Sequence, residues 1–306
     1  MATERELKQR INSVANTSKI TSALAAISAS KANRAQGRVS ATRDYANKAF
    51  EILNNLAGGS SAVSHPMLVD RQEIKSVAII AFTGDRGLAG AYNTDIVRLV
   101  ERFIEKIDPE TTDVKIVAVG KKGRDMFIRR GFNVIASFIA MPDPPSSNDI
   151  SPIAQVVVND YLDGKVDQVF VAYTDFLNMV TRYARMKQLL PLSPTDFTGS
   201  AIAEFFEAPV KAADSGQGGG AGYTYEPPAE DLLDAIVPRF VDLQLYQSYL
   251  ESLASEHSAR YVAMNNATDN AKALIDDLTL ARNKARQTAI TAEILDIVGG
   301  ASALAD

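Results

Sequence analysis

The stretch RINSVANTSKITSALAAISASK, residues 10–31, places apolar or small side chains at alternating steps of four and three residues. The same spacing continues without a break over residues 5–56, at Leu7, Ile11, Val14, Ser18, Thr21, Ala25, Ser28, Ala32, Ala35, Val39, Thr42, Ala46, Ala49, Leu53 and Leu56. Such spacing is typical of the contact seam of a coiled coil. The segment has no proline and one glycine, Gly37. It therefore predicts a single helix, roughly 75 Å long at 1.5 Å rise per residue.

A second long seam lies between residues 229 and 303. It keeps the same step at Ile236, Phe240, Leu243, Gln247, Leu250, Ala254, His257, Tyr261, Met264, Thr268, Ala271, Ile275 and Leu278. We expect this seam then to slip by one position, to Leu274, Leu278, Ala281, Ala285 and Thr288. We also expect Pro238 to start or kink the helix. Two long seams at opposite ends of one chain predict an antiparallel two-helix coiled coil.

Between the seams, residues 75–191 alternate short apolar runs with amphipathic stretches. Four runs read as strands, namely SVAIIAF (76–82), VKIVAVG (114–120), NVIASF (133–138) and QVFVAY (168–173). Helical stretches near 93–106, 121–130 and 151–162 fall between them. This alternation predicts an α/β domain with a largely parallel sheet. The fold class is therefore α/β, with a long antiparallel coiled coil of the N- and C-terminal helices.

We divide the chain into four segments on this basis. They are an N-terminal coiled-coil helix (1–58), an α/β domain (74–205), a connection (206–228) and a C-terminal coiled-coil helix (229–306). The stretch DSGQGGGAGYTYEPP, residues 214–228, is rich in glycine. It predicts a flexible loop or linker inside the connection.

Composition excludes several classes of function. The chain has 306 residues, a net charge of −5, no cysteine and two histidines, His65 and His257. These numbers leave no disulfide or thiol chemistry and no usual zinc ligand set, so we expect no bound metal. The N-terminus lacks the apolar core of a signal peptide, and no run of about 18 apolar residues occurs, so we expect a soluble, unsecreted chain.

Both long helices carry a second apolar stripe away from the seam. In ARNKARQTAITAEIL, residues 281–295, small side chains follow the seam, whereas Ile290, Ile294 and the nearby Ile297 lie almost opposite. Ile20, Leu24 and Ile27 repeat this arrangement on the first helix. The stripes could pack on the α/β domain, but a domain with a radius of gyration of about 13 Å is too small to cover such long helices. We therefore expect an outer partner.

The first helix also carries a concentrated positive stripe. Residues 7–43 contain no acidic residue, and their basic residues are Lys8, Arg10, Lys19, Lys31, Arg34, Arg38 and Arg43. A solvated helix face and contact with the acidic segment 226–256 are both open explanations. Nucleic acid is disfavoured, because no aromatic residue is interleaved and no basic fork follows a zipper. Among outside partners, we favour an acidic protein surface.

A glycine-rich stretch, TGDRGLAGAYN (83–93), follows a predicted strand and opens a helix, where phosphate loops lie. Its glycines match neither the P-loop nor the dinucleotide pattern. The stretch GKKG (120–123) occupies a similar position. Asp85 and Asp175 near strand ends are too few for a cation site. We expect no cofactor and no catalytic residue.

Four stretches resemble the gamma subunits of rotary ATP synthases. They are RINSVANTSKITSALAAISASK (10–31), GDRGLAGAYN (84–93), SEHSARYVAMNNATDNA (255–271) and NKARQTAITAEILDIVGGASAL (283–304). The resemblance covers essentially the whole chain. It implies an antiparallel coiled coil with a Rossmann-like α/β domain at its base. It also implies a central rotor shaft that couples proton flow through a membrane ring to ATP synthesis.

The resemblance further implies partners for named residues. An apolar bearing formed by three catalytic and three non-catalytic ATPase subunits would hold Ile20, Leu24, Ile27, Ile290, Ile294 and Ile297. The catalytic subunits would contact Lys8, Lys19, Lys31, Asp85, Arg86, Gly87, Lys284, Arg286, Gln287 and Thr291. A foot would meet the membrane rotor ring and an epsilon-type subunit through Tyr223, Tyr225 and Glu226.

Two departures from the family pattern affect the helix seam. The family usually has an aromatic residue at the position of Arg282 and larger side chains at residues 24–28. The absence of cysteine argues against the thiol-regulated chloroplast version and favours a bacterial chain. We then expect it at the cytoplasmic face of the plasma membrane, touching the membrane only through the ring. A static coiled-coil scaffold and, less favoured, a nucleotide-binding α/β enzyme with helical arms are the alternatives.

Overall fold

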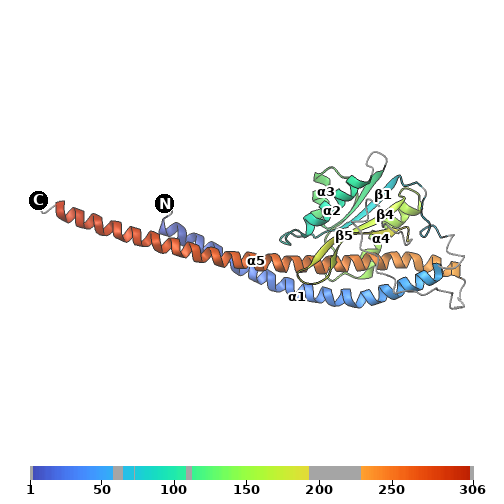
Figure 1. Ribbon diagram of the computed structural model, residues 1–306, viewed down its shortest axis with the longest axis horizontal. Helices are drawn as coiled ribbons and strands as arrows, with labels where there is room; N and C mark the ends of the chain where they lie inside the picture. Colours follow the sequence, from blue (N-terminus) through green and yellow to red (C-terminus); the bar gives the residue numbers. More distant parts are fainter. Residues whose placement is uncertain (1–2, 58–64, 72, 108–111, 193–228, 304–306) are drawn as a thin grey trace. The chain divides into compact units, whose positions relative to one another are not determined.

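The computed structural model describes residues 3–57, 65–71, 73–107, 112–192 and 229–303. Figure 1 shows the elements within these ranges and labels most of them. In chain order they are α1 (Glu4–Ala57), β1 (Ser76–Phe82), α2 (Tyr92–Lys106), β2 (Asp113–Val119), α3 (Lys121–Arg129), β3 (Val134–Phe138), α4 (Ser147–Leu162), β4 (Gln168–Phe176), β5 (Arg182–Leu190) and α5 (Ala229–Ala303).

The chain divides into two compact units, and each long helix contributes to both. The helix-pair unit comprises Met1–Ala29 with Arg260–Asp306, and the α/β unit comprises Ser30–Ala259. The boundary therefore falls after Ala29 on α1 and before Arg260 on α5.

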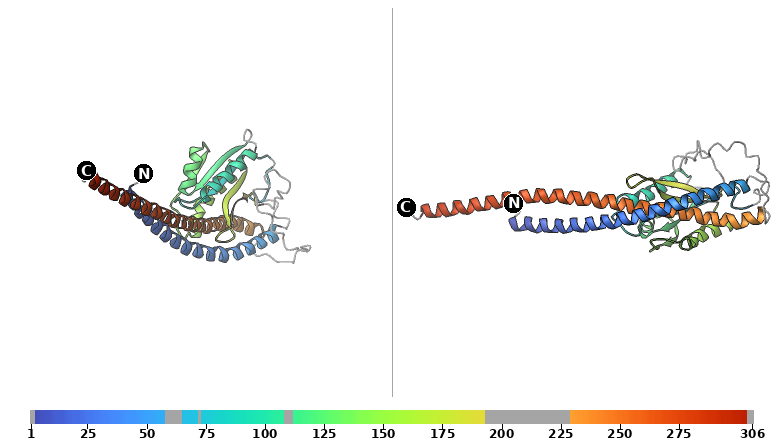
Figure 2. Two further views of the ribbon diagram at one scale, coloured as in Figure 1. Left: turned by 60° about the vertical axis from the view of Figure 1, so that its left-hand side comes forward. Right: turned by 90° about the horizontal axis from the view of Figure 1, so that it is seen from below.

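The helix-pair unit confirms the seam predicted for α1. Leu7, Thr21, Ala25 and Ser28 are buried, and the seam positions between them are half-buried. Across the seam, the Thr21 and Thr268 hydroxyl oxygens lie 2.7 Å apart in a buried hydrogen bond. Figure 2 shows that α1 and α5 run side by side in opposite directions. Small hydroxyl and methyl side chains thus form the centre of this contact, as the sequence predicts.

The predicted slip of the α5 seam is wrong. Leu274 is 46% exposed and Ala281 is exposed, whereas Ile275, Leu278 and Arg282 are half-buried. The original step therefore continues through Arg282. Its long aliphatic stem can fill a seam position that the sequence assigns to an alanine, because arginine packs its methylene groups against apolar surface.

The seam ends earlier on α5 than the sequence suggests. Every described side chain from Arg286 to Val298 is exposed, including Thr288, Ala292 and Leu295, which we expected to follow the seam. The antiparallel register explains this result. Thr21 pairs with Thr268, so Leu7 lies opposite the region of Arg282, and few residues of α1 precede Leu7 to cover later turns of α5.

The α/β unit contains one five-stranded sheet in the order β3-β2-β1-β4-β5. The four predicted strands are confirmed and lie parallel to one another. The sequence missed β5, which pairs antiparallel with β4 at the edge of the sheet. Its sequence RYARMKQLL has only two residues, at its end, in a continuous apolar run. An edge strand that is partly solvated lacks the apolar signature of a central parallel strand.

Helices cover both faces of the sheet. One apolar core joins α2 and α3 to the sheet through residues such as Ile96, Val100 and Phe127. The other core joins α4 and α5 to the opposite face through residues such as Ile153 and Val241. In α5, Pro238 lies inside the helix on its exposed side, so it does not start the helix.

The first helix packs on α5 within this unit as well. Ala35 and Val39 of α1 are buried against Leu250 and Ala254 of α5 and against Phe176 at the end of β4. The helix α4 begins four residues before the predicted 151, at Ser147, because Ser146 and Asp149 form a capping box. Among the described helices, none has the length and apolar content that a membrane crossing requires.

Candidate functional site

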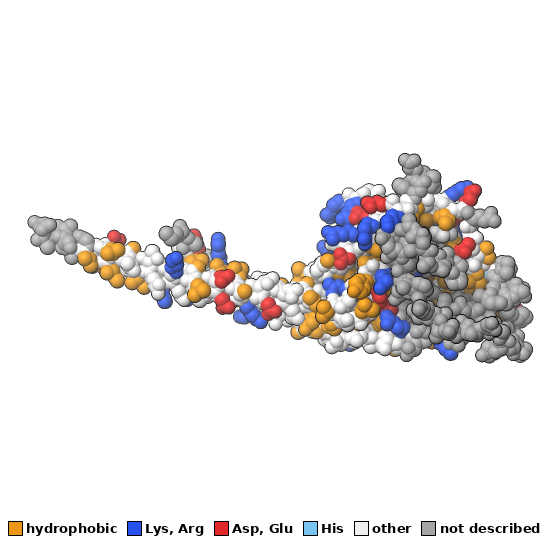
Figure 3. Space-filling model, viewed as in Figure 1, with side chains coloured by type: hydrophobic (Ala, Val, Ile, Leu, Met, Phe, Trp, Pro, Cys, Tyr) orange, Lys and Arg blue, Asp and Glu red, His pale blue; other side chains and the backbone are white. Residues whose placement is uncertain are grey.

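The exposed apolar stripes are the first candidate site. On α5, Ile290, Ile294 and Ile297 are 49%, 54% and 71% exposed. On α1, Ile20 and Ile27 are more than half exposed, while Leu24 is half-buried beside the seam. Figure 3 shows hydrophobic side chains along the surface of the last described turns of α5. These side chains have no cover within their own unit, as expected for residues that await another molecule.

The polar candidates on α5 lie on the same turns. Lys284, Arg286, Gln287 and Thr291 are all exposed. The Thr291 hydroxyl donates to the carbonyl oxygen of Gln287 at 2.9 Å, which is a local helix contact. The surface of this segment therefore combines isoleucine with cationic and amide side chains.

Only some basic side chains of the stripe on α1 are exposed for contact with a partner protein. Lys8 and Lys19 are exposed in the helix-pair unit. In the α/β unit, Lys31 Nζ lies 2.6 Å from Asp143 Oδ2, and Arg43 contacts Glu251. Contact with the acidic segment 226–256 therefore explains Arg43, whereas Lys31 pairs with an acidic residue outside that segment.

Asp85 serves the fold of the α/β unit. Its Oδ1 accepts a hydrogen bond from the amide of Lys121 at 2.8 Å, and its Oδ2 accepts one from the amide of Ala140 at 2.9 Å. The carboxylate thereby occupies the N-terminus of α3, a position that favours negative charge. Its neighbour Arg86 is exposed and Gly87 is half-buried. Of these three residues, Arg86 is the one whose side chain points into solvent.

Gly84 lets the 83–93 loop pack closely on α5. A Cβ on Gly84 would lie 2.7 Å from Glu256 Oε1. Ala89 and Tyr92 are buried together with Ala259 of α5. Close packing of the loop on α5 therefore explains the glycine at position 84.

The described residues also form a groove lined by charged side chains. An open groove of about 660 Å³ lies away from the glycine loop, between α2 and β5. Its charged lining residues are Asp95, Arg98, Glu101, Arg102, Glu105 and Arg182. The three arginines and three carboxylates balance, which gives the groove no preference for an anion. Within the described residues, no group of three or more acidic or histidine side chains could hold a metal.

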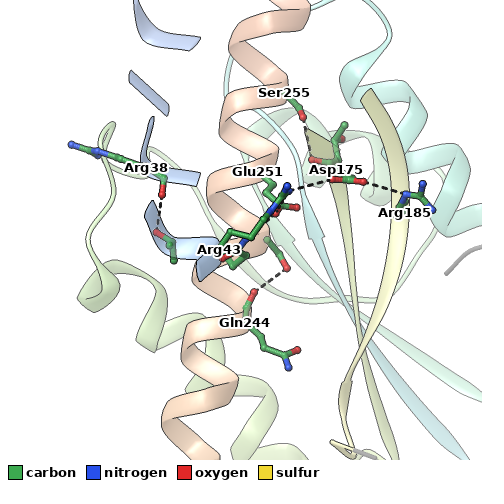
Figure 4. A network of polar contacts seen from close by, with 11 residues as sticks. Arg38, Arg43, Asp175, Arg185, Gln244, Glu251 and Ser255 are labelled. Atoms are coloured by element: carbon green, nitrogen blue, oxygen red, sulfur yellow. Dashed lines mark hydrogen bonds and ion pairs between the residues drawn. The ribbon is translucent and has the colours of Figure 1, made fainter. Parts of the chain in front are cut away.

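Sequence reasoning missed a charged network in the α/β unit. Arg43 Nη2 lies 3.0 Å from Glu251 Oε1 and 4.0 Å from Asp175 Oδ1. Asp175 Oδ2 in turn lies 3.4 Å from Arg185 Nε. Figure 4 shows these four residues converging from α1, α5, β4 and β5. The sequence had placed Asp175 near a strand end and Arg43 on the basic stripe, but a link between elements so far apart in the chain has no local signature.

The predicted foot falls outside the part of the chain that the structure describes. Tyr223, Tyr225 and Glu226 all lie there, as does the glycine-rich stretch around them. Their contact with a rotor ring and an epsilon-type subunit stays a prediction.

Comparison with known proteins identifies the class. A family model described as ATP synthase matches residues 3–304, so the chain belongs to the ATP synthase family. Its similar relatives are gamma chains. The ATP synthase gamma chain of Roseiflexus castenholzii is 42% identical over 307 residues and covers 100% of both chains. That of Chloroflexus aurantiacus is 40% identical over 306 residues and covers 99% of each.

Solved structures share the fold. A chain from the central stalk and c-ring of Tetrahymena thermophila mitochondrial ATP synthase matches with a TM-score of 0.61 at 22% identity, covering 81% of this chain and 99% of that one. A chain of the Euglena gracilis mitochondrial ATP synthase matches with a TM-score of 0.63 at 18% identity, covering 98% and 94%. With the gamma-chain relatives, this fold assigns the chain the role of rotor shaft in a rotary ATP synthase.

Proposed function

We propose that the chain turns inside a ring of alternating ATPase subunits and performs no bond chemistry of its own. Because a two-helix shaft is asymmetric, each angular position would present different side chains to each catalytic subunit. Those contacts would favour a different open or closed state in each subunit, which is how differential binding drives conformational change. Proton flow through the membrane ring would turn the shaft for ATP synthesis, and ATP hydrolysis would turn it in reverse.

The exposed isoleucine stripe of α5 is the observation that supports this proposal most strongly. Ile290, Ile294 and Ile297 lie on turns where every described side chain from Arg286 to Val298 is exposed. Such a surface costs free energy in water unless a partner covers it. An apolar bearing in the ring would cover it on all sides. Ile20, Leu24 and Ile27 of α1 would meet the same ring at another level.

The polar contacts of the proposal follow the residues near these stripes. We propose that Lys8, Lys19, Arg86, Lys284, Arg286, Gln287 and Thr291 contact the catalytic subunits. Lys31 would do so only by sharing its existing ion pair with Asp143. Asp85 and Gly87 would shape the loop that presents Arg86, because the Asp85 carboxylate is already hydrogen-bonded twice.

The remaining partners and the location are part of the same proposal. Three catalytic and three non-catalytic subunits would form the ring. Tyr223, Tyr225 and Glu226 would meet an epsilon-type subunit and the membrane rotor ring. The complex would be peripheral, on the cytoplasmic face of a bacterial plasma membrane, and the domain limits predicted from the sequence (1–58, 74–205, 206–228 and 229–306) would separate shaft, base and foot.

A double variant, Arg286→Ala with Gln287→Ala, tests the proposal. Both side chains are exposed, so the isolated chain should keep its stability within about 0.5 kcal/mol. The assembled complex should lose proton-driven ATP synthesis. Asp276→Ala with Asp277→Ala, at two exposed positions of the same helix, is the matched control. Unchanged synthesis in the first double variant would count against the assigned contact.

Two measurements separate the rotor from its alternatives. A static scaffold predicts that a cross-link between the chain and the ring leaves ATP turnover intact, whereas a rotor predicts that turnover stops. A nucleotide-binding enzyme predicts stoichiometric, tight binding when ATP is titrated into the isolated chain. The rotor predicts no such binding, because Asp85 occupies the N-terminus of α3 and α5 packs against Gly84.

A further inference from the structure

The charged network of the α/β unit lies where three parts of the unit meet. Arg43 comes from α1, Glu251 from α5, and Asp175 and Arg185 from the neighbouring strands β4 and β5. Both carboxylates are deeply buried, with 4% and 7% of the Asp175 and Glu251 side chains exposed. Arg43 is 47% exposed and serves both of them. A single guanidinium group at the surface thus bridges two buried acids.

The contact between α5 and the end of β4 is rich in hydroxyl groups. The Ser252 hydroxyl accepts a hydrogen bond from the amide of Thr174 at 3.0 Å. The Ser255 hydroxyl donates to the carbonyl oxygen of Thr174 at 3.1 Å. Ser248 and Ser258 are also buried on this segment. At this contact between a helix and a buried strand, hydroxyl groups stand where apolar side chains would otherwise pack.

The preceding turns of α5 are built differently. They bury an apolar row in the main core of the unit, at Leu233, Val237, Phe240, Val241, Leu245 and Tyr249. On the turns that follow, Leu250 and Ala254 still pack on Phe176 at the end of β4, and hydroxyl and charged contacts are added to this small apolar cluster. A segment held by a small apolar cluster and by polar contacts can open locally while a larger apolar core stays closed.

The energetics of the network also favour local opening. Burial raises the pKa of Glu251, and hydrogen bonds from Gln247 and Arg43 only partly oppose this rise. Among the described residues, Asp175 Oδ2 and Arg185 Nε are buried without a hydrogen-bond partner, although they lie 3.4 Å apart. Buried carboxylates held by imperfect contacts contribute little net stability. Such a network fixes the relative position of the elements it joins more than it adds to the free energy of unfolding.

We infer that Arg43, Asp175, Arg185 and Glu251 form a charged latch that holds the end of β4 and β5 to α1 and α5, and that opens locally while the apolar core stays closed. The inference rests on the proposed rotor function for its purpose. A shaft that turns against resistance could deform elastically if a contact between its base domain and its helices opened and closed again. The latch residues are positioning residues and perform no chemistry.

Hydrogen exchange of the full-length chain tests the latch directly. The Thr174 amide reports on the latch because Ser252 is its hydrogen-bond acceptor, and the Ile80 amide in central strand β1 reports on the core. In the wild-type chain, Thr174 should exchange at least about tenfold faster than Ile80. Asp175→Asn should accelerate Thr174 by about a further tenfold, since it removes a charge-assisted contact. Ile80 should remain slower than Thr174, because it exchanges only when the whole unit unfolds.

A matched control uses the other end of the same strand. Asp167 at the turn before β4 accepts hydrogen bonds from the amides of Lys75 and Ser76 and contacts Arg71. Asp167→Asn should accelerate exchange of those two amides and leave Thr174 within about twofold. If Asp175→Asn prevents folding, Arg43→Met provides the same test at a half-exposed position. Equal exchange of Thr174 and Ile80 in the wild-type chain, or unchanged exchange of Thr174 in a latch variant, would overturn the latch.

The same variants test the latch and the proposed rotor function separately. In the assembled ATP synthase, Asp175→Asn should keep ATP hydrolysis without a proton gradient within about twofold, while hydrolysis against a gradient should fall several-fold. Failure of the wild-type chain to join an ATPase would refute the proposed function but leave the exchange result standing. Local opening at Thr174 with unaltered hydrolysis against a gradient would overturn the purpose assigned to the latch.

Discussion

Single residues in the α/β unit explain why its loops take their shapes. Gly120, at the turn from β2 into α3, has φ = 98°, and a Cβ there would overlap the carbonyl oxygen of Thr83. The sequence GKKG suggested a helix start at this place but gave no reason for the glycine. The reason is a crossing of two backbones, which only the fold reveals.

We expect Gly120→Ala to lower the free energy of unfolding by about 3 kcal/mol, because it combines a left-handed backbone with a steric overlap. Gly37→Ala is the opposite case. A methyl group on Gly37 in α1 would meet no neighbouring element within 4 Å, so alanine should stabilise the chain by about 0.5–1 kcal/mol. Urea unfolding of the two full-length variants measures both effects. A smaller loss for Gly120→Ala than about 1 kcal/mol would show that the loop can move aside.

Glu251 makes the stability of the chain depend on pH. Burial raises its pKa in the folded state, so folding favours the protonated form. Its contribution to stability is present below the unfolded pKa of about 4.3 and is lost as pH rises through the raised value. Glu251→Gln should therefore gain stability relative to the wild-type chain as the pH of the unfolding measurement is raised from about 4 to 7. Arg43, Gln247 and Asp175 face this carboxyl. Arg43 and Gln247 lower its pKa, and Asp175 raises it.

Asp167→Asn should show the reverse dependence. Burial tends to raise the pKa of Asp167, but hydrogen bonds from the Lys75 and Ser76 amides and from Arg71 lower it overall. Its stabilising contribution is present at neutral pH and is lost as pH falls through the folded value. Parallel slopes for the two variants would contradict the opposite shifts assigned to these carboxyls.

At the scale of elements, α1 is the part that its sequence predicts best. In the helix-pair unit, every seam position from Leu7 to Ser28 is buried or half-buried. The period of four and three residues is a local property, so the sequence contains it directly. The register of α5 past Ala271 depends on which residues of α1 lie opposite, and the leucine at position 274 suggested a seam position that is in fact exposed.

Strand β5 and the charged latch were missed for a related reason. The alternation in Arg182–Leu190 is weak because the strand is an edge with one neighbour, β4. The latch joins residue 43 to residues 175, 185 and 251. Contacts between such distant positions follow from the packing of three elements, and composition or periodicity carries no trace of them.

A cysteine pair can test the antiparallel register of the helix-pair unit. The Thr21 and Thr268 hydroxyl oxygens are 2.7 Å apart, which brings the two β-carbons within range of a disulfide. We expect Thr21→Cys with Thr268→Cys to form a disulfide under mild oxidation, seen as a shift on a non-reducing gel. The chain has no other cysteine, so the product is unambiguous. Thr21→Cys with Lys272→Cys, one turn further along an exposed face, is the control that should not cross-link.

At the scale of the whole molecule, most described segments bury side chains against one another, whereas the turns of α5 from Arg286 to Val298 bury none. The family and the rotor role follow from the full-length match to gamma chains. The sequence resemblance had indicated both. The contacts of individual residues with partner subunits stay predictions, because they belong to surfaces that only an assembled complex completes.

Removal of residues 286–306 should separate folding from assembly. Every described side chain from Arg286 to Val298 is exposed, so a chain that ends at Ala285 should keep its free energy of unfolding within about 0.5 kcal/mol. The assembled complex should lose more of its proton-driven ATP synthesis than of its ATP hydrolysis. Denaturant unfolding and the two activity assays measure these quantities. A loss of several kcal/mol in the isolated chain would mean that these turns pack on the chain itself.

The uncovered turns of α5 also offer a reporter position. A lone thiol introduced at Ala289, which is exposed, would be the only one in a chain that naturally has none. A rigid fluorophore attached there would tumble freely in the isolated chain and would be immobilised by an encircling partner. Its polarised emission would then follow, in real time, both the moment of capture and each subsequent change of angle.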